Sequence, residues 1–180
     1  MITLVRHGEA AAGWGDHPDP GLSDTGYAQA QAVASSLSTR SVSLILTSPM
    51  QRCRETAHAL EKVLDQTALV TPEVSEIPTP EDLQQDRVDW LKGLMAGNWS
   101  DTPPVIQDWR QALIAKIVTL PDNTVVFTHF VAINAIVSGL EGSDAAVVFR
   151  PTYCSQTILE RAADRLQVTR RGAEAETRVL

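Results

Sequence analysis

The sequence is poor in cysteine and in aromatic residues, contains no long apolar run, and carries no excess of positive charge. Its two thiols, Cys53 and Cys154, stand apart, with no CxxC pair and no histidine at metal-ligand spacing. We therefore expect both to be reduced and packed, with a disulfide or a zinc site as the alternatives. The formal net charge of -7 argues against nucleic acid or an acidic membrane as a partner. A local cluster of cations can still hold an anionic substrate inside an acidic protein.

The sequence also lacks a recognisable targeting or membrane segment. No apolar stretch approaches the roughly 18 residues of a transmembrane helix, and the opening residues MITLVRHGEA show no signal peptide. A cytoplasmic location is therefore expected. The 180 residues, of which 43% are hydrophobic and 21% charged, fit a single domain over residues 1–180 that builds its core without disulfides or metals. Polar residues 172–180 are expected to be frayed.

Hydrophobic patterning predicts strands that alternate with helices. Apolar runs predict strands at residues 2–5, 42–46 and 124–128, and two late strands at 157–160 and 166–169. Helices are predicted after Ser23, after a Ser48-Pro49-Met50-Gln51 capping box, around residues 83–95, after Thr102-Pro103 and at 131–139. Residues 74–77 form a short strand or a loop edge. Such alternation indicates βαβ units and an α/β fold with a mostly parallel sheet.

Three of the predicted strands end in groups that suit phosphate. The first is followed by Arg6-His7-Gly8-Glu9, the second by Thr47-Ser48-Pro49 with Arg52, and the third by Thr128-His129-Phe130. In an open parallel sheet, ligands bind beyond the carboxyl ends of the strands, so all three groups are expected at one edge.

These residue types fit phosphoryl transfer, which depends on positioning and on charge stabilisation. Arg6 and Arg52 can each bind a phosphoryl group through two N–H groups of a planar, permanently charged guanidinium. A helix that begins just before Arg52 would also point free amide groups at an anion. One neutral imidazole can attack phosphorus and a second, cationic one can bond a non-bridging oxygen, while a carboxylic acid protonates the leaving oxygen.

The sequence resembles the histidine phosphatase superfamily, also called the phosphoglycerate mutase-like group. The matching blocks are Leu4-Val5-Arg6-His7-Gly8-Glu9, Leu22-Ser23-Asp24-Thr25-Gly26 with Gln29-Ala30, Thr47-Ser48-Pro49-Met50-Gln51-Arg52 with Glu55-Thr56-Ala57, Thr128-His129, and Tyr153-Cys154-Ser155. Several blocks in the right order carry far more weight than a lone RHG. The likeness is loose over residues 67–123.

The resemblance implies a three-layer α/β/α sandwich, His7 as the phosphorylated nucleophile, and a phosphate pocket of Arg6, Arg52 and His129. It also implies that no metal or organic cofactor is needed. Two departures matter. Members usually have glycine after the second histidine, whereas this chain has Phe130, whose ring is expected to narrow or reshape the pocket mouth. The general acid falls in the least similar segment, where Glu76 is the first candidate and Glu81 and Asp82 are the fallbacks.

The resulting hypothesis is a metal-independent phosphatase that acts on a small phosphomonoester or on a phosphorylated protein residue through a phosphohistidine at His7. Two alternatives stay open. A phosphoglycerate-type mutase would share the intermediate but return the phosphoryl group to its substrate. A catalytically weak member would instead bind a phosphorylated ligand or partner as an interaction module.

Overall fold

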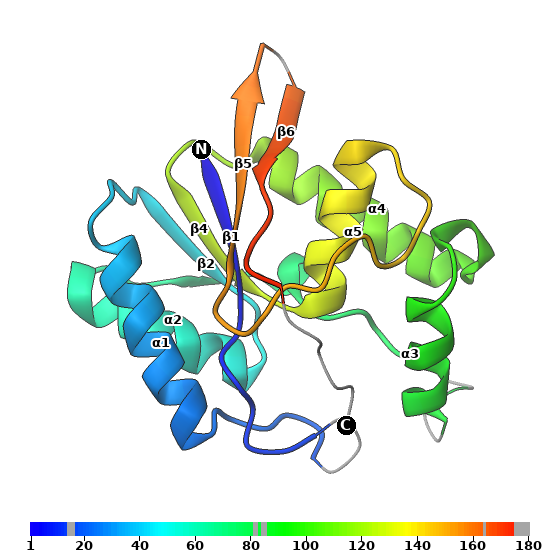
Figure 1. Ribbon diagram of the computed structural model, residues 1–180, viewed down its shortest axis with the longest axis horizontal. Coiled ribbons are helices and arrows are strands. Elements are labelled where there is room, and N and C mark those ends of the chain that lie inside the picture. Colours follow the sequence, from blue (N-terminus) through cyan, green and yellow to red (C-terminus); the bar gives the residue numbers. More distant parts are fainter. Residues whose placement is uncertain (14–16, 81–82, 84–85, 164, 175–180) are drawn as a thin grey trace.

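The computed structural model of the protein describes residues 1–13, 17–80, 83, 86–163 and 165–174. Within them, six strands form one sheet in the order β3-β2-β4-β1-β5-β6 (Figure 1). The strands are β1 Ile2–Arg6, β2 Leu44–Thr47, β3 Leu69–Val70, β4 Thr124–Thr128, β5 Gln156–Ala162 and β6 Arg165–Arg170. The pairs β1·β4, β4·β2 and β2·β3 are parallel, whereas β1·β5 and β5·β6 are antiparallel. The expected mostly parallel sheet is confirmed.

Helices cover both faces of the sheet, which confirms the three-layer α/β/α sandwich. Helices α1 Asp24–Leu37 and α2 Gln51–Leu64 lie on one side, and α3 Arg87–Met95, α4 Pro104–Thr119 and α5 Phe130–Glu141 on the other (Figure 1). Neighbouring strand residues point to opposite faces, so Val5 packs into the α1·α2 core whereas Leu4 packs into the core beneath α4 and α5. Two short 3-10 turns, η1 Pro72–Val74 and η3 Trp99–Asp101, join the later elements.

The start of α2 differs from the predicted capping box. The helix begins at Gln51, its N-cap is Met50, and Met50 makes no side-chain cap bond. Ser48 is instead used by the site, since its hydroxyl lies 2.8 Å from His129 Nε2. The backbone amide of Gln51 donates to Asp19 Oδ1 at 2.9 Å, so a distant loop satisfies the helix end.

Several predicted boundaries also move. Of the two alternatives for residues 74–77, the loop edge is found: a 3-10 turn ends at Val74 and loop follows, while the short strand β3 lies just before it at Leu69–Val70. The helix expected around 83–95 begins only at Arg87. In the segment expected to be frayed, the amide of Gly172 donates to Thr157 Oγ1 at 3.2 Å, and residues 175–180 lie outside the described part. No helix in the described part is long and apolar enough to span a bilayer.

Candidate active site

The three polar strand ends meet at one edge of the sheet, as the sequence predicts. Strands β1 and β4 are parallel neighbours with Arg6 opposite Thr128, and β2 pairs with the other side of β4 with Thr47 opposite Phe127. The residue after each strand therefore enters the same space. The rings of His7 and His129 lie 5.3 Å apart between centroids, and both side chains are buried.

Two glycines fix the loop that carries His7. A Cβ atom on Gly8 would lie 2.7 Å from the carbonyl oxygen of Gly26, and one on Gly26 would lie 2.1 Å from that of Glu9. Only glycine permits this approach between the end of β1 and the first turn of α1. Glu9 Oε1 also accepts the Ser23 hydroxyl at 2.6 Å. These residues of the first two blocks therefore have structural roles that hold His7 in place.

His7 is held as a neutral imidazole with one defined acceptor nitrogen. Its Nδ1 lies 2.7 Å from the carbonyl oxygen of Gly8, an acceptor, so Nδ1 carries the proton. Its Nε2 accepts from Arg52 Nε at 3.2 Å. Burial, followed by the charges of Arg52 and Arg6, lowers the pKa of His7 well below its usual value. The lone pair of Nε2 is therefore available to an electrophile at neutral pH.

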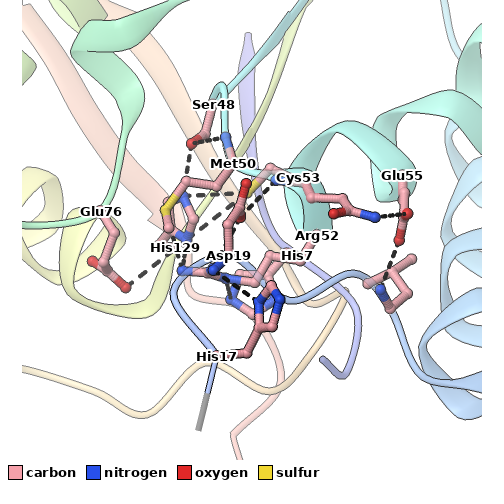
Figure 2. A network of polar contacts seen from close by, with 12 residues as sticks. His7, His17, Asp19, Ser48, Met50, Arg52, Cys53, Glu55, Glu76 and His129 are labelled. Atoms are coloured by element: carbon pink, nitrogen blue, oxygen red, sulfur yellow. Dashed lines mark hydrogen bonds and ion pairs between the residues drawn. The ribbon is translucent and has the colours of Figure 1, made fainter. Parts of the chain in front are cut away.

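Arg52 bridges the two histidines. Its Nη2 lies 3.2 Å from His129 Nδ1, its Nε donates to His7, and its Nη1 lies 3.8 Å from Asp19 Oδ1 (Figure 2). The side chain is only 5% exposed. Three different nitrogens of one rigid guanidinium are therefore engaged, which is the planar arrangement expected of a phosphate-binding arginine.

His129, like His7, is held as a neutral imidazole in the substrate-free site. Because Arg52 donates to its Nδ1, the proton is on Nε2, which donates to the Ser48 hydroxyl at 2.8 Å. Complete burial, and then the charges of Arg52, His7 and Arg6, lowers the pKa of His129 well below its usual value. The sulfur of Cys53 lies 3.4 Å from Nε2, and burial raises the pKa of that thiol.

Glu76 reaches the site from the loop after η1. Its Oε2 lies 3.9 Å from His129 Nδ1, and its Oε1 accepts the Ile77 amide at 3.1 Å. Burial raises the pKa of Glu76, although Arg52 opposes the shift. Because the pKa of His129 is lowered, its imidazole does not supply the positive charge that an ion pair with Glu76 would need. The fallback candidates Glu81 and Asp82 lie outside the described residues.

Arg6 is buried beside the histidines but is held differently from Arg52. Its Nη1 donates to the carbonyl oxygen of Pro151 at 2.8 Å, and desolvation lowers the pKa of its guanidinium. Phe130, which directly follows His129, is buried in the core and lies beside Arg6. Its side chain is only 4% exposed because it packs into the core at the start of α5, and its ring centroid lies 5.3 Å from Arg6 Cζ.

Two further charged residues were missed by the sequence reasoning. Asp19, from the loop after β1, contacts both the start of α2 and Arg52. Arg87, the first residue of α3, is partly buried, and desolvation lowers its pKa while Glu76 raises it. Its position four residues before the buried Leu91 is the helical spacing that could have placed it on the inward face. Nothing in the sequence around Asp19 indicates its role.

The described residues contain no group of three or more His, Cys, Asp or Glu side chains placed to hold a metal ion. What the site does offer is a neutral imidazole acceptor, a second imidazole, two buried guanidiniums and a carboxyl group that tends to keep its proton. This set can bind an oxyanion, accept a phosphoryl group on nitrogen and deliver a proton to an oxygen.

Comparison with known proteins gives a family match and a consistent fold. The family model described as the histidine phosphatase superfamily (branch 1) matches residues 2–174. A curated relative, the uncharacterized protein Rv0525 of Mycobacterium tuberculosis, is 37% identical over 80 residues, which span 42% of this chain and 40% of that protein.

Three solved structures superpose over nearly the whole chain. The mycobacterial glucosyl-3-phosphoglycerate phosphatase Rv2419c has a TM-score of 0.75 at 21% identity, covering 97% of this chain and 99% of that one. The phosphoserine phosphatase of Entamoeba histolytica, in complex with 3-phosphoglyceric acid, has a TM-score of 0.74 at 20% identity, covering 99% and 98%. The alpha-ribazole phosphatase of Shigella flexneri has a TM-score of 0.72 at 19% identity, covering 97% and 96%. At these identities the likeness concerns the fold.

Proposed function

Because the chain belongs to the histidine phosphatase superfamily, we propose that it hydrolyses phosphomonoesters through a phosphohistidine on Nε2 of His7. The observation that carries this proposal is the bridge of Arg52 between His7 Nε2 and His129 Nδ1, at 3.2 Å to each. A guanidinium in that position can grip a phosphoryl group and hold it against the lone pair that attacks it.

The first half of the reaction places a phosphoryl group on nitrogen. The Nε2 lone pair of His7 forms a bond to phosphorus while the bond from phosphorus to the ester oxygen breaks. That oxygen keeps the electron pair and takes a proton from Glu76, so the product leaves as an alcohol. The raised pKa of Glu76 supports this role, because a general acid must hold its proton near neutral pH.

The second half regenerates the enzyme. A water molecule attacks the phosphorus, Glu76 as carboxylate takes one of its protons, and the nitrogen–phosphorus bond breaks. The electron pair returns to His7 and inorganic phosphate leaves. His129 gains a proton more readily once a phosphate dianion lies beside it, since a nearby negative charge raises an imidazole pKa. It would then donate to a non-bridging oxygen.

The substrate class that we propose is a phosphomonoester, either a small molecule or a phosphorylated protein residue. Proteins of this fold named for glucosyl-3-phosphoglycerate, phosphoserine and alpha-ribazole phosphate support a small molecule. Arg87 adds a partly buried cation near Glu76 and Arg52, which favours a substrate with a second anionic group. Matched hydrolysis rates on 3-phosphoglycerate and glycerol 3-phosphate, in the parent and in Arg87→Gln, test this preference directly.

One feature favours catalysis over a phospho-ligand-binding module. Glu76 lies buried beside His129, with its Oε2 3.9 Å from His129 Nδ1, so the site retains a carboxyl group that could act as the acid. A mutase would share the phosphohistidine intermediate, and its product distinguishes it from a phosphatase. A phosphatase releases inorganic phosphate from a single substrate, whereas a mutase returns the phosphoryl group to the organic product.

The proposal is tested by trapping the intermediate. Rapid-quench labelling with a radioactive phosphate ester should give an acid-labile, base-stable phosphoenzyme in the parent and none in His7→Ala, with both proteins folded by circular dichroism. His58→Ala, which changes an exposed histidine of α2 that pairs with Glu61, is the matched control and should label normally. Turnover should persist in a strong chelator. Labelling that survives in His7→Ala, or activity that requires an added metal, would overturn the mechanism.

A further inference from the structure

Two aromatic rings lie against Arg6. The guanidinium carbon is 4.0 Å from the ring centroid of Tyr153 and 5.3 Å from that of Phe130. Both distances are within the roughly 6 Å over which a ring face attracts a cation, and the attraction grows when the pair is removed from water. Arg6 is 5% exposed and Phe130 is 4% exposed, whereas Tyr153 is partly exposed. Arg6 is therefore packed between aromatic and backbone groups and not free to reorient in solvent.

The same surroundings leave one donor of Arg6 without an acceptor. One N–H group, on Nη1, is fixed by the carbonyl oxygen of Pro151 at 2.8 Å. The Nε group is buried and has no hydrogen-bond partner among the described residues. A buried donor of this kind is costly to leave unpaired, and an oxyanion is the acceptor that a guanidinium matches best.

The rings also lie next to the proposed reacting group. The ring of Tyr153 is 5.8 Å from the ring of His7, and Phe130 follows His129 directly in the chain. The charge of Arg6 contributes to lowering the pKa of both histidines, so the guanidinium lies near both imidazoles. A glycine at position 130, as in the pattern that the sequence otherwise resembles, could supply no ring.

We propose that Phe130 and Tyr153 form an aromatic clamp, the two rings that hold Arg6 so that its unpaired Nε–H group binds the phosphoryl group bound for His7. They are positioning residues, because they act on the substrate through Arg6. The clamp rests on the proposed function for the identity of its ligand as a phosphate. Loss of one ring is expected to lower kcat/KM roughly 2- to 30-fold, the range that a single cation–π contact is worth.

The test compares two buried phenylalanines that each contact an arginine. Phe130→Leu removes a ring of the clamp. Phe149→Leu removes a ring that is also 4% exposed and belongs to the same core, but that ring lies 5.5 Å from Cζ of Arg171 and not against Arg6. Both substitutions should lower the melting temperature to a similar extent. Only Phe130→Leu should lower kcat/KM for p-nitrophenyl phosphate and weaken the binding of inorganic phosphate measured by calorimetry.

A double-mutant cycle separates positioning from a general loss of core packing. In an Arg6→Ala background, Phe130→Leu should have less than a 2-fold further effect on kcat/KM, because the residue that the ring positions is gone. An undiminished effect in that background would overturn the clamp. Tyr153→Leu should behave as Phe130→Leu does, and it keeps the test decisive if the latter fails to fold.

The remaining outcomes distinguish the clamp from the function on which it rests. Tyr153→Phe keeps the ring and should retain most of the activity. A decrease in kcat/KM equal to that of Tyr153→Leu would assign the effect to the hydroxyl group and overturn the role of the ring. A parent that neither hydrolyses the ester nor binds phosphate would overturn the proposed function and the clamp together. A parent that does both, with Phe130→Leu and Phe149→Leu alike in kcat/KM, would overturn the clamp alone.

Discussion

Arg52 is the residue whose substitution tests the site most directly, because it joins both histidines. Two of its N–H groups point at His7 Nε2 and His129 Nδ1, each at 3.2 Å, and a bound phosphoryl group would receive both. Lysine offers one compact ammonium and cannot span the two positions. Loss of one preorganised donor costs about 10²- to 10³-fold in rate, or about 2.7–4 kcal/mol. We expect a decrease of that size in kcat/KM for Arg52→Lys and a larger one for Arg52→Gln.

The two substitutions should differ in pH dependence. The charge of Arg52 lowers the pKa of both His7 and His129, and their neutral forms are those present in the free site. The rate falls at the pH where the attacking imidazole gains a proton, and this decrease is the acid limb of the pH–rate profile. A lowered imidazole pKa keeps the acid limb at low pH. Arg52→Gln removes the repelling charge, the imidazole pKa rises, and the limb should move to higher pH. Arg52→Lys keeps the charge and should leave the limb nearly in place.

The assay is the pH profile of kcat/KM for p-nitrophenyl phosphate, expressed as the ratio of variant to parent at each pH so that substrate ionisation cancels. Arg54→Gln is the matched control, since Arg54 lies two residues further along the same helix and is exposed. It should change neither the rate nor the limb. Full activity in Arg52→Lys would refute the two-point contact, and an unmoved limb in Arg52→Gln would refute the electrostatic coupling.

Three further outcomes are expected. In single-turnover kinetics, Glu76→Gln should slow phosphorylation by alkyl phosphates far more than by nitrophenyl phosphate, whose leaving group needs little protonation; equal losses would make Glu76 a positioning residue. Because folding lowers the pKa of His7 and His129, the free energy of unfolding should fall as pH drops below about 6.5, by up to about 1.4 kcal/mol per pH unit per histidine. Urea unfolding should show a weaker dependence of this free energy on pH in the His7→Asn/His129→Asn variant. Thr128→Val removes the 2.6 Å bond to the Val74 carbonyl oxygen that anchors the Glu76 loop, so urea unfolding should show a loss of about 1–3 kcal/mol that Thr128→Ser does not.

Much of the fold could be predicted because its central strands are buried on both faces. Strand β4 was predicted at residues 124–128 and forms at Thr124–Thr128, and β1 extends by one residue beyond its prediction. A short apolar run that is rich in β-branched residues and bounded by polar residues favours such a strand. The Ser23 cap of α1 was equally clear, and the Gly26 amide donates to its hydroxyl at 3.0 Å.

The elements that the sequence did not reveal depend on contacts between distant segments. Strand β3 consists of two exposed residues, Leu69 and Val70, and exists because it pairs with β2; its apolar stretch is too short to signal a strand by itself. The start of α2 has a plausible local cap in Ser48, but His129 competes for that hydroxyl from 81 residues away and Asp19 takes over the helix end. Local patterns cannot report such a competition.

For the candidate site, the sequence by itself determined which chemical groups are present and at which edge of the sheet they gather. Only the tertiary structure decided their state. Arg52 meets His7 from 45 residues away and His129 from 77, and burial among these charges keeps both imidazoles neutral. The same folding turned Phe130 inward onto Arg6. Protonation and orientation depend on distance and desolvation between remote segments, and those quantities exist only once the chain has folded.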